Sequence, residues 1–439
     1  MIDLPLAVAL AEKHSFQLKA SEHAVAAAVA QLDEARISPF FQFRSRFGMA
    51  LVPDAHGVPG YTPDPTNQIA RDFSPALAAG IEGAIPVWTF GKLQGARDAA
   101  RAGVRAAETQ RLRTRADLRY QVRRAFYGLA FALDTQQMLD EGLPRIEQAL
   151  KRLEEKLDAG DADANESDRY RVATVIAEIR ARRAEAEHMA RSATSALEAL
   201  TGRDGVSIPE CPLAPLAFVP GELDTYRSDA QAHRPELLIL SAALDARHAE
   251  LDVARARYFP DIAIALGAET QYAPGRTPDA YYTQWFLAAG IVARWDLDFP
   301  GHAFREERAL QKSLELENQR QAALDGTRVE VSDRYAAVVD ALARAKAWDE
   351  GHRDARRWFI SAAQNHQLGV LPIEDLVDAV TAYFRARFAR LQALFDLNTA
   401  VAALELVVGS PLLPDAAWSL ACAETAQDDD ERDVPADAK

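Results

Sequence analysis

The most regular pattern in the chain is an alternation of large apolar residues with small or polar ones. It occupies residues 41–51, 76–87, 261–272 and 285–297. In the third segment, Ile262, Ile264 and Leu266 alternate with alanine and glycine. A period of two residues predicts β-strands with two different faces. Each segment holds about 10 to 13 residues, the length that a tilted strand needs to cross a bilayer.

A second pattern, Ala, Leu, Arg and Glu at helical spacing, fills most of the remaining chain. It predicts helices over roughly 4–35, 93–158, 165–200, 224–257, 303–367 and 374–408. At about 1.5 Å per residue, the two long helices would span about 100 Å and the shorter ones about 50 Å. This match of lengths predicts a rod-like bundle, in which each long helix lies beside two shorter helices stacked end to end.

The order of these elements occurs twice, which indicates a duplicated chain. The segment "ALEALTG" at 196–202 returns as "ALELVVG" at 403–409. Gly91, after the first strand pair, aligns with Gly301 after the second. We therefore expect a first repeat over 1–202 with a β-hairpin at 40–89, a linker over 203–222, a second repeat over 223–409 with a β-hairpin at 259–299, and a C-terminal segment with an acidic tail over 410–439.

The predicted strands favour a membrane-spanning barrel. Aromatic residues such as Trp88, Phe259 and Trp295 lie near the strand ends, as in the aromatic girdles of such barrels. A sheet in lipid must close, because open edges leave backbone groups without hydrogen-bond partners. Known barrels need at least about eight strands, so several chains would have to share one barrel. A soluble coiled-coil scaffold with small hairpins is the alternative that the helices alone would allow.

Composition narrows the class of function further. The chain has 439 residues, 49% of them hydrophobic, and a net charge of −15, which argues against a nucleic-acid partner. It has no apolar run of about 18 residues, so we expect no transmembrane helix. The first residues also lack the basic and apolar regions of a signal peptide. Read literally this indicates the cytosol, unless the true start of the protein lies upstream.

The sequence offers little chemistry for catalysis. The nucleotide-binding, nucleophile-elbow and zinc-protease motifs are absent, and the nine histidines lack metal-ligand spacing. We therefore expect no enzyme activity, no cofactor and no metal. Cys211 and Cys422 either pair or remain free, since two cysteines do not define a disulfide framework.

The duplicated plan resembles a known family, the outer-membrane efflux proteins, or TolC-like trimeric channel-tunnels. The resemblance rests on Arg-x-x-Pro at both strand entries (36–39 and 257–260), on "IPVWTFGK" at 85–92 and on the segment 368–409. It implies a mixed fold, an all-α tunnel plus a β-barrel. Long coiled helices would carry four transmembrane β-strands per chain, and a homotrimer would form a twelve-stranded barrel and an α-helical barrel.

The resemblance also implies a function. The protein would be a passive conduit for efflux or type I secretion, set in the outer-membrane lipid with a periplasmic tunnel. It would work with a periplasmic adaptor (membrane fusion) protein and an inner-membrane RND or ABC transporter. The transported substrate and the lipidation state are not readable from the sequence, and the lipidated N-terminal cysteine of many members is not visible here.

By the same resemblance, acidic residues after the second glycine break ring the closed end of the tunnel. The matching positions here are Asp375 and Asp378, with Ser167 and Asp168 as their counterparts in the first half. A solvated helix start would favour the same residue type without any pore. In a trimer, two carboxylates per chain would surround one axis and attract cations. Leu371 and Pro372 stand where many members have a basic or polar residue, so the closing contacts are expected to differ.

The faces of the predicted strands give a second set of candidate residues. Charged residues on the face with small side chains would line the barrel lumen. These are Arg44, Arg46, Glu82, Glu269, Arg294 and Asp296. Exposed charges on a soluble sheet are the alternative interpretation.

Overall fold

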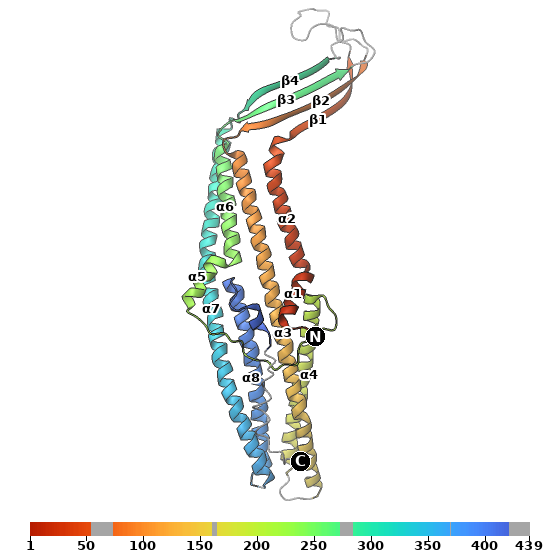
Figure 1. The fold of residues 1–439 in the computed structure, drawn as a ribbon, viewed down its shortest axis with the longest axis vertical. Coiled ribbons are helices and arrows are strands. Elements are labelled where there is room, and N and C mark those ends of the chain that lie inside the picture. Colours follow the sequence, from red (N-terminus) through yellow and green to blue (C-terminus); the bar gives the residue numbers. More distant parts are fainter. Residues whose placement is uncertain (54–72, 160–164, 273–283, 369, 421–439) are drawn as a thin grey trace, which may run out of the picture. The chain divides into compact units, whose positions relative to one another are not determined.

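The computed structural model describes residues 1–53, 73–159, 165–272, 284–368 and 370–420 (Figure 1). Its helices are α1 (Leu4–His14), α2 (Phe16–Ile37), α3 (Lys92–Asp158), α4 (Glu166–Thr201), α5 (Leu223–His233), α6 (Pro235–Ala256), α7 (Phe299–Gln367) and α8 (Ile373–Val408). Its strands are β1 (Gln42–Pro53), β2 (Phe73–Trp88), β3 (Asp261–Tyr272) and β4 (Gln284–Arg294). Short 3-10 turns cover Ser38–Phe40 and Asp415–Trp418.

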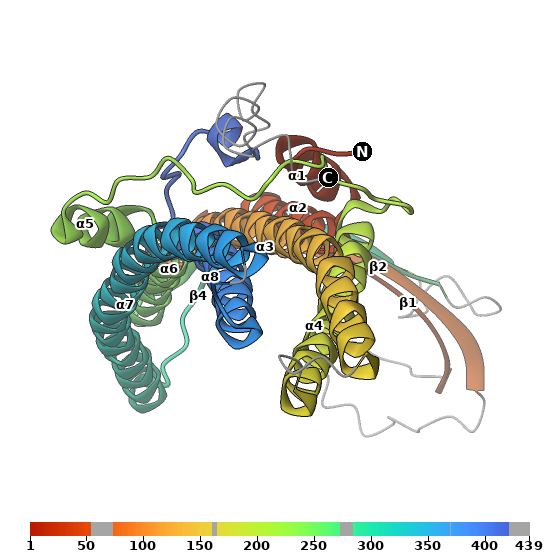
Figure 2. The same ribbon diagram turned by 90° about the horizontal axis from the view of Figure 1, so that it is seen from below.

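The described chain forms two compact units. The first contains residues 1–22, 109–238 and 322–439, and the second contains residues 23–108 and 239–321. The second unit holds the sheet and the helical segments that flank it, while the first holds the main hydrophobic core. Figure 2 shows the same ribbon seen from below, after a turn of 90° about the horizontal axis.

The predicted long helices correspond to α3 and α7, but the first helix of each half is broken. The segment 4–35 forms α1 and α2 with a break at Ser15, and the segment 224–257 forms α5 and α6 with a break at Arg234. The Ser15 hydroxyl accepts a hydrogen bond from the Leu18 amide (3.2 Å), which starts the second helix. Arg234 precedes Pro235, and a residue before proline is disfavoured in helical conformation.

Each break in the first unit receives the end of a shorter helix. α4 and α8 end at Gly202 and Gly409, both with positive φ (68° and 78°). A Cβ atom on Gly202 would lie 2.2 Å from the His14 ring, and one on Gly409 would lie 2.8 Å from the His233 carbonyl oxygen. Each of the two positions therefore requires glycine for two reasons, the positive φ angle and the close approach of the neighbouring residue. These contacts stack α4 against α1 and α8 against α5.

Gly91 and Gly301, which align in the two predicted repeats, have different conformations. Gly91 has φ of 97° and precedes α3, and Phe90 before it also has a positive φ (53°). Gly301 lies inside the first turn of α7, where the Asp298 carboxylate accepts its amide hydrogen bond (3.1 Å). One strand pair thus leads into its helix through a left-handed turn, and the other through a side-chain cap.

The four strands form one antiparallel sheet in the order β1-β2-β3-β4 (Figure 1). β1 and β4 therefore stand at its two edges. Gly83 of β2 faces Phe43 of β1, and a Cβ atom there would lie 2.3 Å from the aromatic ring. The ring of Phe43 thus covers the backbone of β2 at this glycine.

The segment 203–222 packs onto the first unit as a strap. Leu213 and Leu216 are buried in its core. The Leu213 amide donates to the Asp134 carboxylate of α3 (2.7 Å). Asn398 of α8, fully buried, accepts from the Leu216 amide (3.0 Å) and donates to the Ala214 carbonyl oxygen (2.9 Å). Burial raises the pKa of the Asp134 carboxyl, with the Leu213 hydrogen bond opposing the shift.

The described C-terminal residues also join this core. Trp418 is buried, and the Arg123 guanidinium lies 3.7 Å from its ring centroid. The same arginine pairs with Glu405 (2.5 Å), so the guanidinium is contacted by both a ring and a carboxylate. The predicted acidic tail lies outside the described residues. Cys211 is disulfide-bonded, and Cys422 lies outside the described residues.

Helix α8 differs from the expectation about transmembrane helices. A window within residues 374–408 reaches a mean hydropathy of 1.5, which by length and composition alone would suffice to cross a membrane. However, 56% of that window is buried within the chain itself. Leu394, Leu397 and Leu404 pack into the core of the first unit, so we interpret α8 as a core helix.

Replacing Asn398 by alanine is expected to loosen the strap. The change leaves the Leu216 amide and the Ala214 carbonyl without partners, which costs about 2 to 3 kcal/mol. We expect a lower melting temperature and faster proteolysis within 203–222. Thr399→Ala, which removes two hydrogen bonds within α8 and none to the strap, serves as the control. An Asn398→Ala protein that melts like the wild type would contradict the role of the strap.

Candidate functional site

One face of the sheet carries large apolar side chains that the chain itself leaves exposed. The register places Phe47, Ala79, Thr270 and Trp285 side by side on this face. Phe47 is 80% exposed, Trp285 81% and Ile291 81%. Other exposed members are Met49, Leu51, Leu77, Ile81 and Leu287. A continuous apolar surface of this kind needs an apolar neighbour, either a partner or a membrane.

The opposite face carries small and charged residues. Arg44 of β1 pairs with Glu82 of β2, which in turn pairs with Gly267 of β3. In the same way Arg46 pairs with Gly80, which in turn pairs with Glu269. Arg294, at the end of β4, lies opposite Asp261 on the same face. The sheet thus brings five of the six residues that the alternation assigned to a lumen onto one face. Asp296 lies beyond the end of β4, where its carbonyl oxygen bonds the His302 ring (3.1 Å).

The junction between sheet and helices is fixed by contacts that the sequence did not reveal. Lys92, the first residue of α3, binds the Asp261 carboxylate (2.8 Å) and the Phe259 carbonyl oxygen (2.9 Å). The rings of Phe90 and Phe259 stack with centroids 5.0 Å apart. These contacts connect the exit of β2 to the entry of β3, so they join the two halves of the chain.

The first turns of α4 and α8 hold the candidate pore residues. Asp375 and Asp378 lie in the first two turns of α8, and both are exposed. Ser167 is also exposed, in the first turn of α4. Asp168 differs, since it is only 6% exposed and its Oδ1 atom has no hydrogen-bond partner among the described residues. The first-half pair therefore does not present two side chains to solvent as the second-half pair does.

Contacts near these residues differ from simple solvated helix starts. Arg171 of α4 lies 3.6 Å from Glu374 of α8 and so connects the two helix starts. Sequence reasoning missed this pair, although each residue lies within a few positions of a predicted site residue. The Leu371 carbonyl oxygen is bonded by the His366 ring (2.9 Å), and the Val370 amide donates to Asn365 (2.9 Å). Backbone carbonyl oxygens thus accept the hydrogen bonds that hold this turn.

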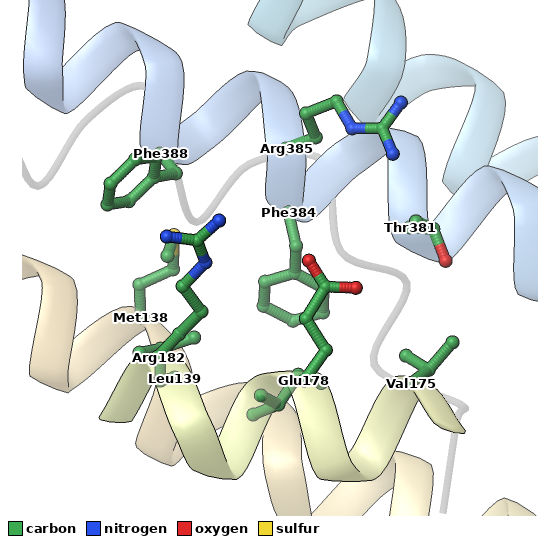
Figure 3. A pocket seen from close by; sticks show the side chains of 10 residues that line it. Met138, Leu139, Val175, Glu178, Arg182, Thr381, Phe384, Arg385 and Phe388 are labelled. Carbon is green, nitrogen blue, oxygen red and sulfur yellow. The ribbon is translucent and has the colours of Figure 1, made fainter. Parts of the chain in front are cut away.

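A cavity of about 140 Å³ lies between α3, α4 and α8 (Figure 3). Met138, Phe384 and Phe388 form its apolar lining, and Glu178, Arg182 and Arg385 supply charged groups. Gly142 permits the close approach of α8, because a Cβ atom there would lie 2.1 Å from the Phe384 ring. The described residues include no cluster of His, Cys, Asp or Glu that could hold a metal ion. The cavity is a groove between three packed helices.

His352 of α7 lies in surroundings that shift its pKa strongly. Its ring contacts Tyr383 of α8 (5.6 Å between centroids), and its Nε2 atom has no hydrogen-bond partner among the described residues. Burial, together with the cations of Arg390 and Arg387, lowers the pKa of His352 to about 4. The pKa of nearby Asp349 is also lowered, by hydrogen bonds from Arg353 and Arg390.

Comparisons with known proteins match this geometry. Residues 226–410 match the family model described as outer membrane efflux protein. The pyoverdine export outer membrane protein OpmQ of Pseudomonas aeruginosa is 26% identical over 360 residues, 79% of this chain and 73% of that protein. Protein CyaE of Bordetella pertussis is 30% identical over 182 residues, 41% of this chain and 38% of that protein.

Solved structures extend the likeness to nearly the whole chain. CusC superimposes with a TM-score of 0.76 at 18% identity, covering 93% of this chain and 92% of that one. The CmeC outer membrane channel of Campylobacter jejuni gives 0.74 at 16% identity, covering 93% and 86%. The fold is therefore that of the TolC-like outer-membrane channels, as the sequence predicted. Within this fold, residues 226–410 are similar to the outer membrane efflux protein family.

The lowered pKa of His352 predicts a dependence of stability on pH. An unfolded histidine titrates near 6.5, and the folded one near 4. The contribution of neutral His352 to the stability of the folded state is complete above pH 6.5. It is lost as the pH falls towards 4, because protons then bind the unfolded state preferentially. We expect His352→Gln to flatten the fall in melting temperature over this range, and the exposed His188→Gln to leave it unchanged. Equal slopes for both variants and the wild type would refute this.

Proposed function

We propose that this protein is the outer-membrane channel of an export system for efflux or type I secretion. It acts as a homotrimer with a periplasmic adaptor protein and an inner-membrane RND or ABC transporter. The two halves, 1–202 and 223–409, are structural repeats joined by 203–222 and followed by the C-terminal segment 410–439. The common order of helix pair, strand pair, long helix and shorter helix supports this division.

The observation that carries the proposal is the incomplete sheet. Its four strands leave β1 and β4 without partners on their outer sides within the described chain. One of its faces exposes large apolar residues, and the other carries glycine, alanine and charges. Backbone groups in lipid must be paired, and barrels need at least about eight strands. Three chains, each joining β1 to the β4 of a neighbour, would close a barrel of twelve strands.

The soluble scaffold considered from the sequence does not account for this sheet. A soluble protein would cover the apolar face with other parts of the chain, yet Phe47, Trp285 and Ile291 remain exposed. A lipid surface accounts for that face, and an aqueous lumen accounts for the small and charged one. Arg44, Arg46, Glu82, Glu269, Arg294 and Asp296 would then line or border the lumen.

The channel acts as a passive conduit and not as an enzyme. Energy for transport comes from the inner-membrane partner, so the channel itself needs only a path and a gate. OpmQ is a pyoverdine export protein, which is the same class of task, the release of a solute across the outer membrane. The gate would lie at the helical turns with Asp375 and Asp378, near Ser167 and the buried Asp168.

Neutralising the two exposed carboxylates is expected to change ion selectivity. In a trimer, Asp375 and Asp378 would place rings of negative charge around the axis and favour cations. We expect Asp375→Asn with Asp378→Asn to shift the reversal potential in a planar bilayer under a salt gradient towards anions. Asp325→Asn with Asp354→Asn, two exposed acids elsewhere on α7, serves as the control. Unchanged conductance and selectivity would exclude the ring.

Neighbouring residues of β4 provide a test of the lipid face. Leu287 lies on the exposed apolar face, and Ala288 lies on the opposite one. An arginine facing lipid near the midplane costs about 2 to 4 kcal/mol, whereas one facing water does not. We expect Leu287→Arg to reduce the amount of trimer in extracted outer membranes strongly, and Ala288→Arg to reduce it little. Equal losses, or a soluble monomer in all cases, would overturn the barrel.

A further inference from the structure

A groove with an excess of positive charge lies in the unit that contains the sheet. α3, α6 and α7 enclose a cavity of about 360 Å³ close to the helix–strand junctions. Four basic residues line it, Arg257, Arg305, Arg308 and Lys312, against the single carboxylate of Glu250. This excess is notable in a chain whose net charge is −15.

The neighbouring carboxylates pair with only one of these four cations, Arg305. Glu250 pairs with Arg247 (2.7 Å) and Glu306 pairs with Arg255 (3.1 Å). Asp298 pairs with Arg305 (3.1 Å). Within the described residues, no carboxylate lies within 4.0 Å of the charged groups of the three remaining cations, which are Arg257, Arg308 and Lys312. These three side chains are also exposed, so their charges remain available to a ligand.

The direction of the helices aims these cations at the sheet. Side chains on a helix lean towards its N-terminus. α7 begins at Phe299, close after β4, so Arg308 and Lys312 lean towards the strands. Both lie within about four turns of that start. Arg257 follows the last residue of α6, only four positions before β3 begins at Asp261. The positive end of the α7 dipole adds to the same potential.

The floor of the groove is apolar. Ala96 and Ala99 of α3, Val253 of α6 and Ala309 of α7 contribute to its lining. Gly95 allows α3 and α6 to approach closely, since a Cβ atom there would lie 2.5 Å from Val253. A soluble anion would use only the cations, whereas a phospholipid would use both the cations, through its phosphate, and the apolar floor, through its glycerol and first acyl carbons. The adjacent membrane sheet favours the lipid.

We propose that this groove binds the headgroup of an anionic phospholipid from the periplasmic leaflet of the outer membrane. Arg257, Arg308 and Lys312 contact the phosphate, and the alanines with Val253 hold the apolar part beneath it. Basic pockets between helices at a membrane surface bind anionic headgroups in this way. The inference rests on the proposed function, because the sheet must cross a membrane for the groove to meet lipid.

The test compares lipid binding by the full-length trimer in detergent. Phosphatidylglycerol and phosphatidylcholine are titrated, and bound lipids are counted by native mass spectrometry. The groove variant is Arg257→Gln, Arg308→Gln and Lys312→Gln together. The control variant carries the same change of charge at exposed cations outside this unit, Arg111→Gln, Lys151→Gln and Lys346→Gln. We expect the wild type and the control to prefer phosphatidylglycerol, and the groove variant to bind it at least about tenfold more weakly.

Three results would overturn the proposal. The first is equal binding of phosphatidylglycerol by the groove and control variants. The second is no preference of the wild type for the anionic lipid over phosphatidylcholine. The third is binding of soluble glycerol phosphate with the same affinity as the lipid, which would assign the groove to a soluble anion.

Conductance of the wild type in a planar bilayer is measured in parallel. A conducting trimer without lipid preference refutes only the lipid site, whereas a protein that forms no trimer and no channel refutes the proposed function.

Discussion

The pairing of backbone groups at the edges of the sheet is the constraint on which the rest of this molecule depends. Lipid offers no hydrogen bonds, so a membrane strand without a neighbour is unstable. β1 and β4 stand at the edges of the four-stranded sheet, and four strands are too few to close on themselves. In the proposed channel, assembly with further copies would then be a condition of stability in the membrane. The helices joined to these strands would follow the same arrangement, because α2 and α6 lead within a few residues into β1 and β3, and β2 and β4 lead within a few residues into α3 and α7.

Periodic features of the chain were predictable, and single-residue features were not. The long helix expected over 93–158 is observed as Lys92–Asp158, because helical periodicity repeats over many turns and averages out local noise. The break at Ser15 was missed because one residue hardly disturbs the apolar spacing on either side. The break at Arg234 had a signal, the following proline, which a long helical pattern outweighed.

The same distinction holds for the candidate sites. Arg44, Glu82 and Glu269 could be assigned to one face of the sheet, because the pleat alternates strictly and the register follows from it. The burial of Asp168 could not be predicted, because it depends on how neighbouring helices cover the first turn of α4. The basic groove was equally hidden. Its lining residues span more than two hundred positions of the sequence, from Gly95 to Lys312, and no local pattern marks them.

The duplication is broken where the two halves have different neighbours. β2 and β3 meet inside one chain, and their junction uses the left-handed turn at Phe90 and Gly91, the Lys92–Asp261 ion pair and stacked phenylalanines. The exit of β4 lies at an edge, and there a capping aspartate, Asp298, with the buried His302 takes the place of the turn. In a closed trimer, β4 of one chain would pair with β1 of the next chain. This seam between chains would repeat the seam that β2 and β3 form within one chain. A seam within a chain forms as the chain folds, whereas a seam between chains must wait for assembly. The second exit therefore needs a cap that is complete within its own chain, and the Asp298 cap fulfils that requirement.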